Sequence, residues 1–221
     1  MLRLALHLQR QLAQKQPAAL LRKLWFVAAN TPRQVGILRV LAQPAFAEYT
    51  LCFPCLRYRY LRENDLARSF TVAQRAACHL HHYRFLSTRF SEDSVRQIMN
   101  RHVSLFELCE AGNRFAIDLA APRNVAGEGE LRLHFRIDGI NIFDLAFSFI
   151  PGWVVDSAAQ NVILISALQG VKGRHDSIRL AEKAFHGIWP AALPVTSFPF
   201  SPCSMLSVHA PCHRLPGGYR L

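Results

Sequence analysis

Apolar residues recur at helical spacing through the first half of the chain. Pro17 suits the first turn of a helix that carries Leu20, Leu21, Leu24 and Val27. A further helix is indicated after the Thr-Pro pair that follows it. The first part of the chain is therefore predicted to be mainly helical.

Two later helices carry sequence signals for their first residues. Thr71 and Gln74 have the spacing of a capping box, in which each side chain bonds to the other residue's backbone N–H. Ser91 is followed by two acidic residues, which suit the positive end of a helix dipole. Residues 1–110 are accordingly predicted to form a helical region.

The hydrophobic pattern changes to period two after Gly112. Leu131, Leu133, Phe135 and Ile137 take every second position, which places them on one face of a β-strand. Similar alternation or short β-branched runs predict four strands in all: Arg114–Leu119, Glu130–Ile137, Ile142–Phe149 and Asn161–Leu168.

Turn and helix signals join these strands into one unit. The Asp138-Gly139 pair between two strands is a strong hairpin signal, so the strands are predicted to form an antiparallel meander. A helix follows the last strand, with Asp176 near its start and Gly187 just past its end. The predicted fold class is α+β: a helical N-terminal half, then a meander with a packed helix in residues 111–187.

The last segment, residues 188–221, is different. It has no acidic residue and no clear period, and it holds six of the 12 prolines in the chain. A disordered tail is normally more polar than this one. An irregular covering segment and a reading frame that differs from the ancestral one both remain open.

The composition and charge of the chain indicate which classes of partner it could bind. The chain is 51% hydrophobic with a formal net charge of +11, which is typical of a globular protein that attracts polyanions. The basic residues are spread out, and the densest stretch, Arg57 to Arg62, alternates with aromatic residues. Such alternation is more typical of an exposed strand or loop with one buried side, so nucleic acid is not expected as the partner.

The sequence also lacks the usual membrane signals. Charged residues interrupt the apolar residues at the start before they reach signal-peptide length, and no run has the 18 or more apolar residues of a spanning helix. A cytoplasmic protein is expected, and its six cysteines are then most simply free thiols.

Two groups of side chains have spacings associated with metal or redox chemistry. Cys52 and Cys55 form one C-x-x-C pair, a weak signal without the context of a redox motif or a matching second pair. His79 and His82 share a helix face, but no carboxylate accompanies them as in H-E-x-x-H. Partly buried histidines with satisfied hydrogen bonds are the simpler interpretation, and no metal is predicted.

The loop before the last predicted helix is the best candidate binding site. Glycines leave backbone N–H groups free there, the helix start adds partial positive charge, and nearby cations add full charges. The candidate residues for holding a phosphate or pyrophosphate are Gln169, Gly170, Lys172, Gly173 and Arg174. An ordinary tight connection that needs glycine for its dihedral angles is the alternative.

Five short motifs in order resemble the VirK/YbjX family, a bacterial group without an established biochemical activity. The motifs are HHYRFL (81–86), GEGELRLHF (127–135), FDLAFSF (143–149), ISALQG (165–170) and KAFHGIWP (183–190). The resemblance implies a cytoplasmic bacterial protein associated with envelope or surface-protein function, virulence and stress, including resistance to antimicrobial peptides. An envelope protein client, or an anionic surface at the inner membrane, would then be its partner.

The resemblance stops near Pro190. Family members continue with a Leu- and Ala-rich helix and a further strand, whereas residues 188–221 resemble nothing in the family. A frameshift near codon 188 or 190 would explain the missing acidic residues and the prolines together.

Two functions of different classes are therefore predicted. The order of strands, glycine-bearing loop and helix is similar to that of the acetyltransferase superfamily, where this loop holds the pyrophosphate of coenzyme A. Coenzyme A or acyl-CoA is then the expected ligand, although no general base is apparent. The other candidate is a non-enzymatic envelope or stress factor that binds an anionic surface or a protein client.

Overall fold

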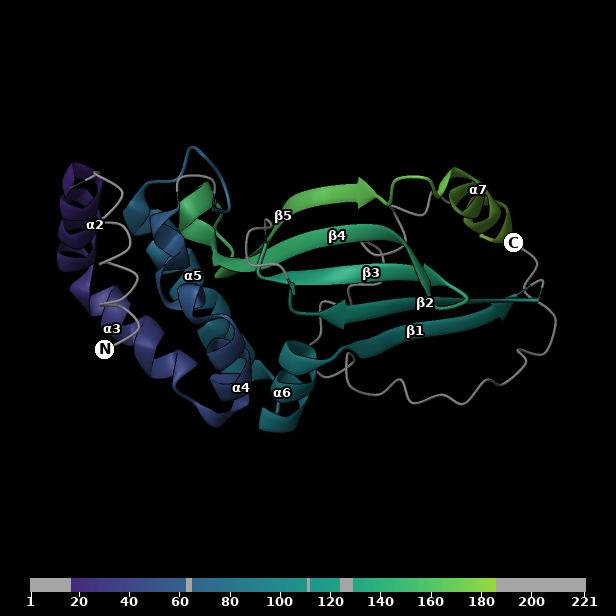
Figure 1. Ribbon diagram of the computed structural model, residues 1–221, viewed down its shortest axis with the longest axis horizontal. Coiled ribbons are helices and arrows are strands. Elements are labelled where there is room, and N and C mark those ends of the chain that lie inside the picture. The colour runs from purple at the N-terminus through teal and green to yellow at the C-terminus, as the bar shows by residue number, and fades with distance from the viewer. Residues whose placement is uncertain (1–16, 63–64, 111, 124–128, 186–221) are drawn as a thin grey trace.

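The computed structural model describes residues 17–62, 65–110, 112–123 and 129–185 of the chain (Figure 1). Helices come first: α2 (Pro17–Ala29), α3 (Thr31–Leu41), α4 (Pro44–Cys52), the 3-10 helix η1 (Pro54–Leu61), α5 (Val72–Arg89) and α6 (Glu92–Asn100). The sheet region follows: β1 (Val103–Glu110), β2 (Asn113–Ala120), β3 (Leu131–Ile137), β4 (Ile140–Pro151), the 3-10 helix η2 (Gly152–Val155), β5 (Asn161–Gly170) and α7 (His175–Ala184). The predicted α+β class is confirmed.

Local signals in the sequence set the starts of two helices. The Thr71 hydroxyl accepts a hydrogen bond from the Gln74 N–H, and the Gln74 side chain accepts one from the Thr71 N–H, so the capping box at α5 is complete. At α6 the Ser91 hydroxyl accepts a hydrogen bond from the N–H of Ser94 and so caps the helix. Both predicted starts are confirmed, and α6 buries Val95 as expected.

The five strands form one antiparallel sheet in the order β1-β2-β3-β4-β5. Asp138 and Gly139 both have positive φ, 50° and 78°, and form the predicted two-residue turn between β3 and β4. The sheet begins at Val103, inside the region 1–110 that was predicted to be helical. The edge strand β1 is half-buried or exposed along its whole length, so its sequence lacks the clean alternation that revealed the others.

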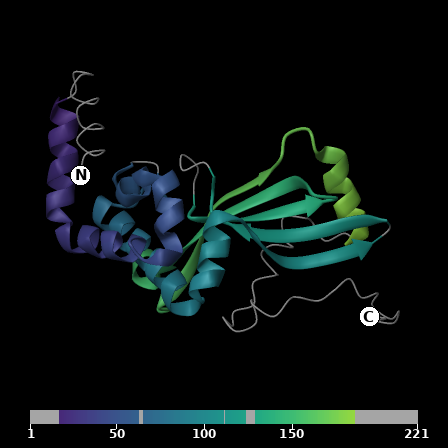
Figure 2. The same cartoon turned by 60° about the horizontal axis from the view of Figure 1, so that its bottom comes forward.

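The two faces of the sheet differ in chemistry. Leu131, Leu133, Phe135 and Ile137 are buried on one face, as predicted from their period, while the residues between them on β3 are only half-buried. Helices cover the apolar face at two places. Figure 2 shows α5 and α6 near one end of the strands and α7 across the other.

Aromatic packing holds α7 on the sheet. The ring of Phe185, just after α7, lies 5.2 Å from that of Phe115 on β2 and 6.0 Å from that of Phe135 on β3. Ala181 of α7 is fully buried in the core that the sheet shares with the N-terminal helices. The helix face predicted from Ile178, Ala181 and Phe185 is therefore the one that packs.

The stretch from Arg57 to Arg62 differs from its prediction. It was expected to be an exposed strand or loop with one buried side, but most of it belongs to η1, and Arg59 and Tyr60 are buried. Arg59 is buried because it pairs with two buried carboxylates, Asp65 six residues further along and Glu130 at the start of the sheet region. The segment that was expected to be exposed on one side therefore contains Arg59, one of the most buried charged residues among those that the structure describes.

Candidate functional site

The predicted loop lies at the end of β5, on the open edge of the described sheet. Gln169 and Gly170 are the last residues of β5, paired with Asp144 and Phe143 of β4. The N–H of Val171 donates to the carbonyl of Ile142 at 3.0 Å, which keeps the loop attached to the sheet. The five candidate residues are thus contiguous with a fixed strand end.

The loop turns into α7 through a left-handed glycine. Gly173 has a φ of 80°, and nothing lies within 4 Å of the position that a Cβ would take. The N-cap residue of α7 is Arg174, which makes no side-chain capping bond. The cap residue therefore offers no side-chain acceptor to the first N–H groups of α7, which lie next to the exposed backbone of the loop.

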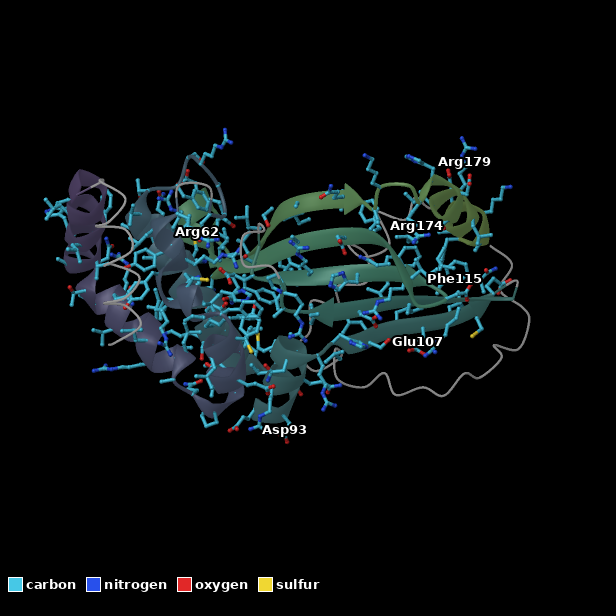
Figure 3. The ribbon with its side chains drawn as sticks, in the orientation of Figure 1. Arg62, Asp93, Glu107, Phe115, Arg174 and Arg179 are labelled. Carbon is cyan, nitrogen blue, oxygen red and sulfur yellow. The ribbon has the colours of Figure 1, made fainter. Side chains whose placement is uncertain are left out.

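Cations surround this helix start. Lys172, Arg174 and Arg179 are all exposed, and Figure 3 shows Arg174 and Arg179 on the part of the molecule formed by α7. The exposed Asp176 in the first turn opposes them with one negative charge. The loop thus combines a helix dipole with an excess of positive charge, which favours an anion.

A second group of charged residues is fully buried where the helices meet the sheet. Glu130, immediately before β3, accepts hydrogen bonds from the Tyr83 hydroxyl at 2.7 Å and from His79 Nδ1 at 3.0 Å. Its other neighbour is Arg59, whose Nη1 lies 3.4 Å from Glu130 Oε2. Arg59 Nε also donates to Asp65 Oδ1 at 2.8 Å. These five residues, the buried charge cluster, come from η1, the segment after it, α5 and the start of β3.

Electrostatics within the cluster follow from burial and mutual pairing. Burial disfavours the charge of Glu130, but Arg59 and then His79 outweigh it and hold the pKa of the Glu130 carboxyl well below its usual range. Burial, followed by the charge of Glu130, raises the pKa of Asp65 despite the opposing Arg59. Glu130 is therefore the permanent anion of the group.

The two polar contacts of His79 hold its ring in place. Nε2 lies 2.8 Å from the carbonyl oxygen of Leu56, and Nδ1 lies 3.0 Å from Glu130 Oε1. Both ring nitrogens therefore have partners, and the ring links η1 to the residue that precedes β3.

Asp65, His79 and Glu130 also have the donor types of a metal site, with one ligand atom of each within 4.8 Å of the others. Most of their donor atoms are already engaged, however, although Asp65 Oδ2 has no hydrogen-bond partner among the described residues. Both nitrogens of His79 and both oxygens of Glu130 have partners, and Arg59 bonds to both carboxylates. A metal ion would have to displace a guanidinium, so the group is better described as an ion-pair network than as a metal site.

The cysteine pair and the histidine pair singled out in the sequence have different surroundings. Cys52 and Cys55 are exposed free thiols. His79 and His82 are both fully buried, and His82 Nδ1 accepts a hydrogen bond from the N–H of Phe149. The cysteines and histidines of residues 188–221 lie outside the described residues, as does Gly187.

Local sequence patterns do not indicate the buried charge cluster. Glu130 has only the pattern of the first residue of a strand, and Asp65 has no local signal, because its role depends on an arginine six residues away that is turned inward. A single acidic residue at the start of an otherwise apolar, basic strand was the one available signal.

The comparisons with known proteins give a family and no activity. Residues 24–200 match the model of a family described as "Protein of unknown function (DUF535)", a span of well over half of the chain that includes the first part of residues 188–221. No curated protein and no solved structure matches the chain. In the part of the chain that the structure describes, no helix is long and apolar enough to cross a membrane.

Proposed function

The chain belongs to the DUF535 family, which is the VirK/YbjX family, and we propose that it binds coenzyme A or an acyl-CoA through the loop before α7, as an acyltransferase-like protein. The observation that carries the proposal is the start of α7. Left-handed Gly173 presents exposed backbone between Lys172 and Arg174, and α7 begins there without a side-chain cap. A diphosphate is the ligand group that such a helix start, flanked by cations, holds well.

The arrangement around the loop supports this ligand. Strand β5 ends directly at the loop, and its far side has no partner strand among the described residues, so its edge could pair with the amides of a pantetheine chain. Ile165 and Leu168 on β5 are exposed and offer apolar contact along the same strand. The order of strand, loop and packed helix matches the acetyltransferase superfamily, an analogy at the level of fold.

A thermal-shift titration with coenzyme A, acetyl-CoA and the phosphates of adenosine alone tests the proposal. Ligand bound to the native state stabilises it, so the melting temperature rises with the logarithm of ligand concentration above the dissociation constant. The Gly173→Asp variant should abolish the shift because the new carboxylate repels the diphosphate. Asp176→Asn should strengthen binding, since it removes the one opposing charge from the first turn of α7.

Gly139→Asp is the matched control. Gly139 has a φ of 78° and open space around its Cβ position, as Gly173 does, but it lies in the β3–β4 turn. Both substitutions therefore introduce similar backbone strain and the same charge, and only that at Gly173 should remove the ligand response. A folded wild-type protein that shows no shift at millimolar coenzyme A would overturn the proposal.

A second candidate is the envelope, virulence and stress role that the family resemblance implies, exercised by a cytoplasmic protein peripheral to the inner membrane. Two observations favour an anionic surface as partner: the net charge of +11, and the exposed apolar side chains of Leu21, Leu24 and Trp25 on α2. Helix α2 lies at the outer end of the helical region in Figure 1. An envelope protein client is the alternative partner within the same role.

Sedimentation with anionic vesicles at low and high salt tests this candidate. Binding through surface charge must weaken as salt rises, because the screening length shortens. A Leu24→Ser, Trp25→Ser double variant should reduce the binding that remains at high salt. Binding that is absent at low salt, or equal for vesicles with and without anionic lipid, would exclude the surface as partner.

A further inference from the structure

The second face of the sheet carries a polar group that none of the roles above uses. On β3, Arg132, His134 and Arg136 alternate with the buried leucines and phenylalanine, so all three lie on the face opposite the apolar core. Arg136 is paired with Asp118 of β2, its Nε 2.9 Å from Asp118 Oδ2. Arg132 and His134 have other neighbours.

His134 forms a dyad with an acidic residue on the neighbouring strand. His134 and Asp144 are direct partners in the β3–β4 ladder, and His134 Nδ1 lies 2.5 Å from Asp144 Oδ1. Asn141 Nδ2 donates to the same oxygen at 2.8 Å. These hydrogen bonds outweigh burial and lower the pKa of Asp144, so its carboxylate is ionised and accepts the proton on Nδ1.

This tautomer leaves the other ring nitrogen as a proton acceptor. A neutral imidazole that donates from Nδ1 carries a lone pair on Nε2, which is the arrangement of a histidine held by a carboxylate for general base catalysis. The side chains of His134 and Asp144 are 22% and 26% exposed, so solvent reaches a dyad that its neighbours still hold in place.

Two polar atoms beside the dyad lack partners. Arg132 Nε and Asn141 Oδ1 are buried without a hydrogen bond among the described residues, and the charge of Arg132 helps to lower the pKa of the Asp144 carboxyl. The partners of Arg132 across the ladder are Ala120 on β2 and Ala146 on β4, neither of which can satisfy a guanidinium. Buried polar atoms are normally satisfied, so an unmet donor and an unmet acceptor on one face indicate a missing binding partner.

The geometry points to a binding site on this face for a small molecule that carries a carboxylate or phosphate group and a hydroxyl group. Arg132 would hold the anion, since a guanidinium matches both groups in charge and shape. The hydroxyl group would donate a hydrogen bond to Asn141 Oδ1 or to His134 Nε2. The site needs no coenzyme A and stands independently of the proposed function, although Asp144 and Gln169 are ladder partners and the two sites adjoin.

Isothermal titration calorimetry on the full chain, with L-malate, succinate and inorganic phosphate as probes, tests the site. All three carry an anionic group, but only malate adds an alcohol, so malate is expected to bind more tightly than succinate. Arg132→Gln should weaken malate binding by about tenfold or more, because a charge-assisted hydrogen bond is lost. Arg132→Lys, which keeps the charge without the planar fork, should lie in between.

Arg89→Gln, an exposed arginine near the end of α5, is the control for a general change in charge and should leave binding unchanged. A second measurement follows the ring resonances of His134, assigned by their loss in His134→Gln, which should shift when malate is added. They should not shift in Arg132→Gln. Equal malate affinity in wild type and Arg132→Gln, or no heat and no shift with any probe at millimolar concentration, overturns the proposal.

Discussion

The acid sensitivity of the fold should depend on His82. The ring of His82 is fully buried on α5, stacked on Phe149 with the ring centres 5.7 Å apart. Its Nδ1 accepts a hydrogen bond from the N–H of Phe149 at 3.1 Å, and its Nε2 has no partner among the residues that the structure describes. A second proton on this ring would therefore add a charge where nothing receives it.

Burial and the surrounding charges together set the pKa of His82. Burial lowers the pKa of His82 most; Glu130 raises it, while His79, Arg59 and His81 lower it further, to about 3 from the ordinary value of 6.5. The unfolded chain takes up the proton near pH 6.5, but the folded chain does so only near pH 3. Stability is thus complete above that upper value and declines as the pH falls between the two.

The magnitude follows from linkage. Each pH unit between the two pKa values removes about 1.4 kcal/mol of the free energy of unfolding. At about pH 5 the loss from His82 alone is then about 2 kcal/mol relative to about pH 8. The depressed pKa values of Glu130 and Asp144 act only at lower pH, where carboxylates take up protons.

Urea denaturation of the wild type and of His82→Gln at both pH values measures the effect. Glutamine keeps an acceptor for the Phe149 N–H but does not titrate. The variant therefore loses the stacking energy equally at every pH, and it lacks the acid sensitivity that His82 contributes. The wild type should lose about 2 kcal/mol more than the variant on acidification. An equal loss in both proteins would show that His82 is not held neutral and would refute the argument.

Three further predictions concern stability and reactivity. Arg59→Met should lower the free energy of unfolding by about 3–5 kcal/mol in urea melts, because it leaves buried carboxylates unpaired, whereas exposed Arg68→Gln should change it little. Gly129→Ala should destabilise far more than Gly139→Ala in the same assay: both have positive φ, but only the Cβ at Gly129 would meet backbone, at 2.8 Å. Burial raises the pKa of Cys78 to about 12, so mass spectrometry after brief alkylation at neutral pH should find it unmodified while the exposed cysteines react; equal labelling would contradict its burial.

Sequence patterns predicted the parts of this fold that local chemistry determines. The capping box at Thr71, the turn at Asp138 and Gly139, and the alternation along β3 each depend on residues close in the chain, and all are confirmed. Strand β1 was missed because an edge strand that is half-buried along its length has no strong period.

The buried charges could not be predicted in this way. Arg59 and Glu130 are 71 residues apart, and no local pattern indicates that a basic side chain between two tyrosines turns inward to reach a distant carboxylate. The loop at Gln169 to Arg174 was placed correctly between a strand and a helix because glycines and caps are local signals. Its ligand stays a prediction, since affinity depends on contacts that spacing alone does not specify.

The buried charge cluster has a consequence for how the protein can be divided. Its members Arg59 and His79 belong to η1 and α5, while its principal anion, Glu130, lies immediately before β3. A fragment limited to the sheet region would keep Glu130 without Arg59 and His79, and a helical fragment would keep Arg59 and His79 without their carboxylate. Neither half is a self-sufficient folding unit, so the helical region and the sheet should unfold in a single cooperative transition and resist separation by truncation.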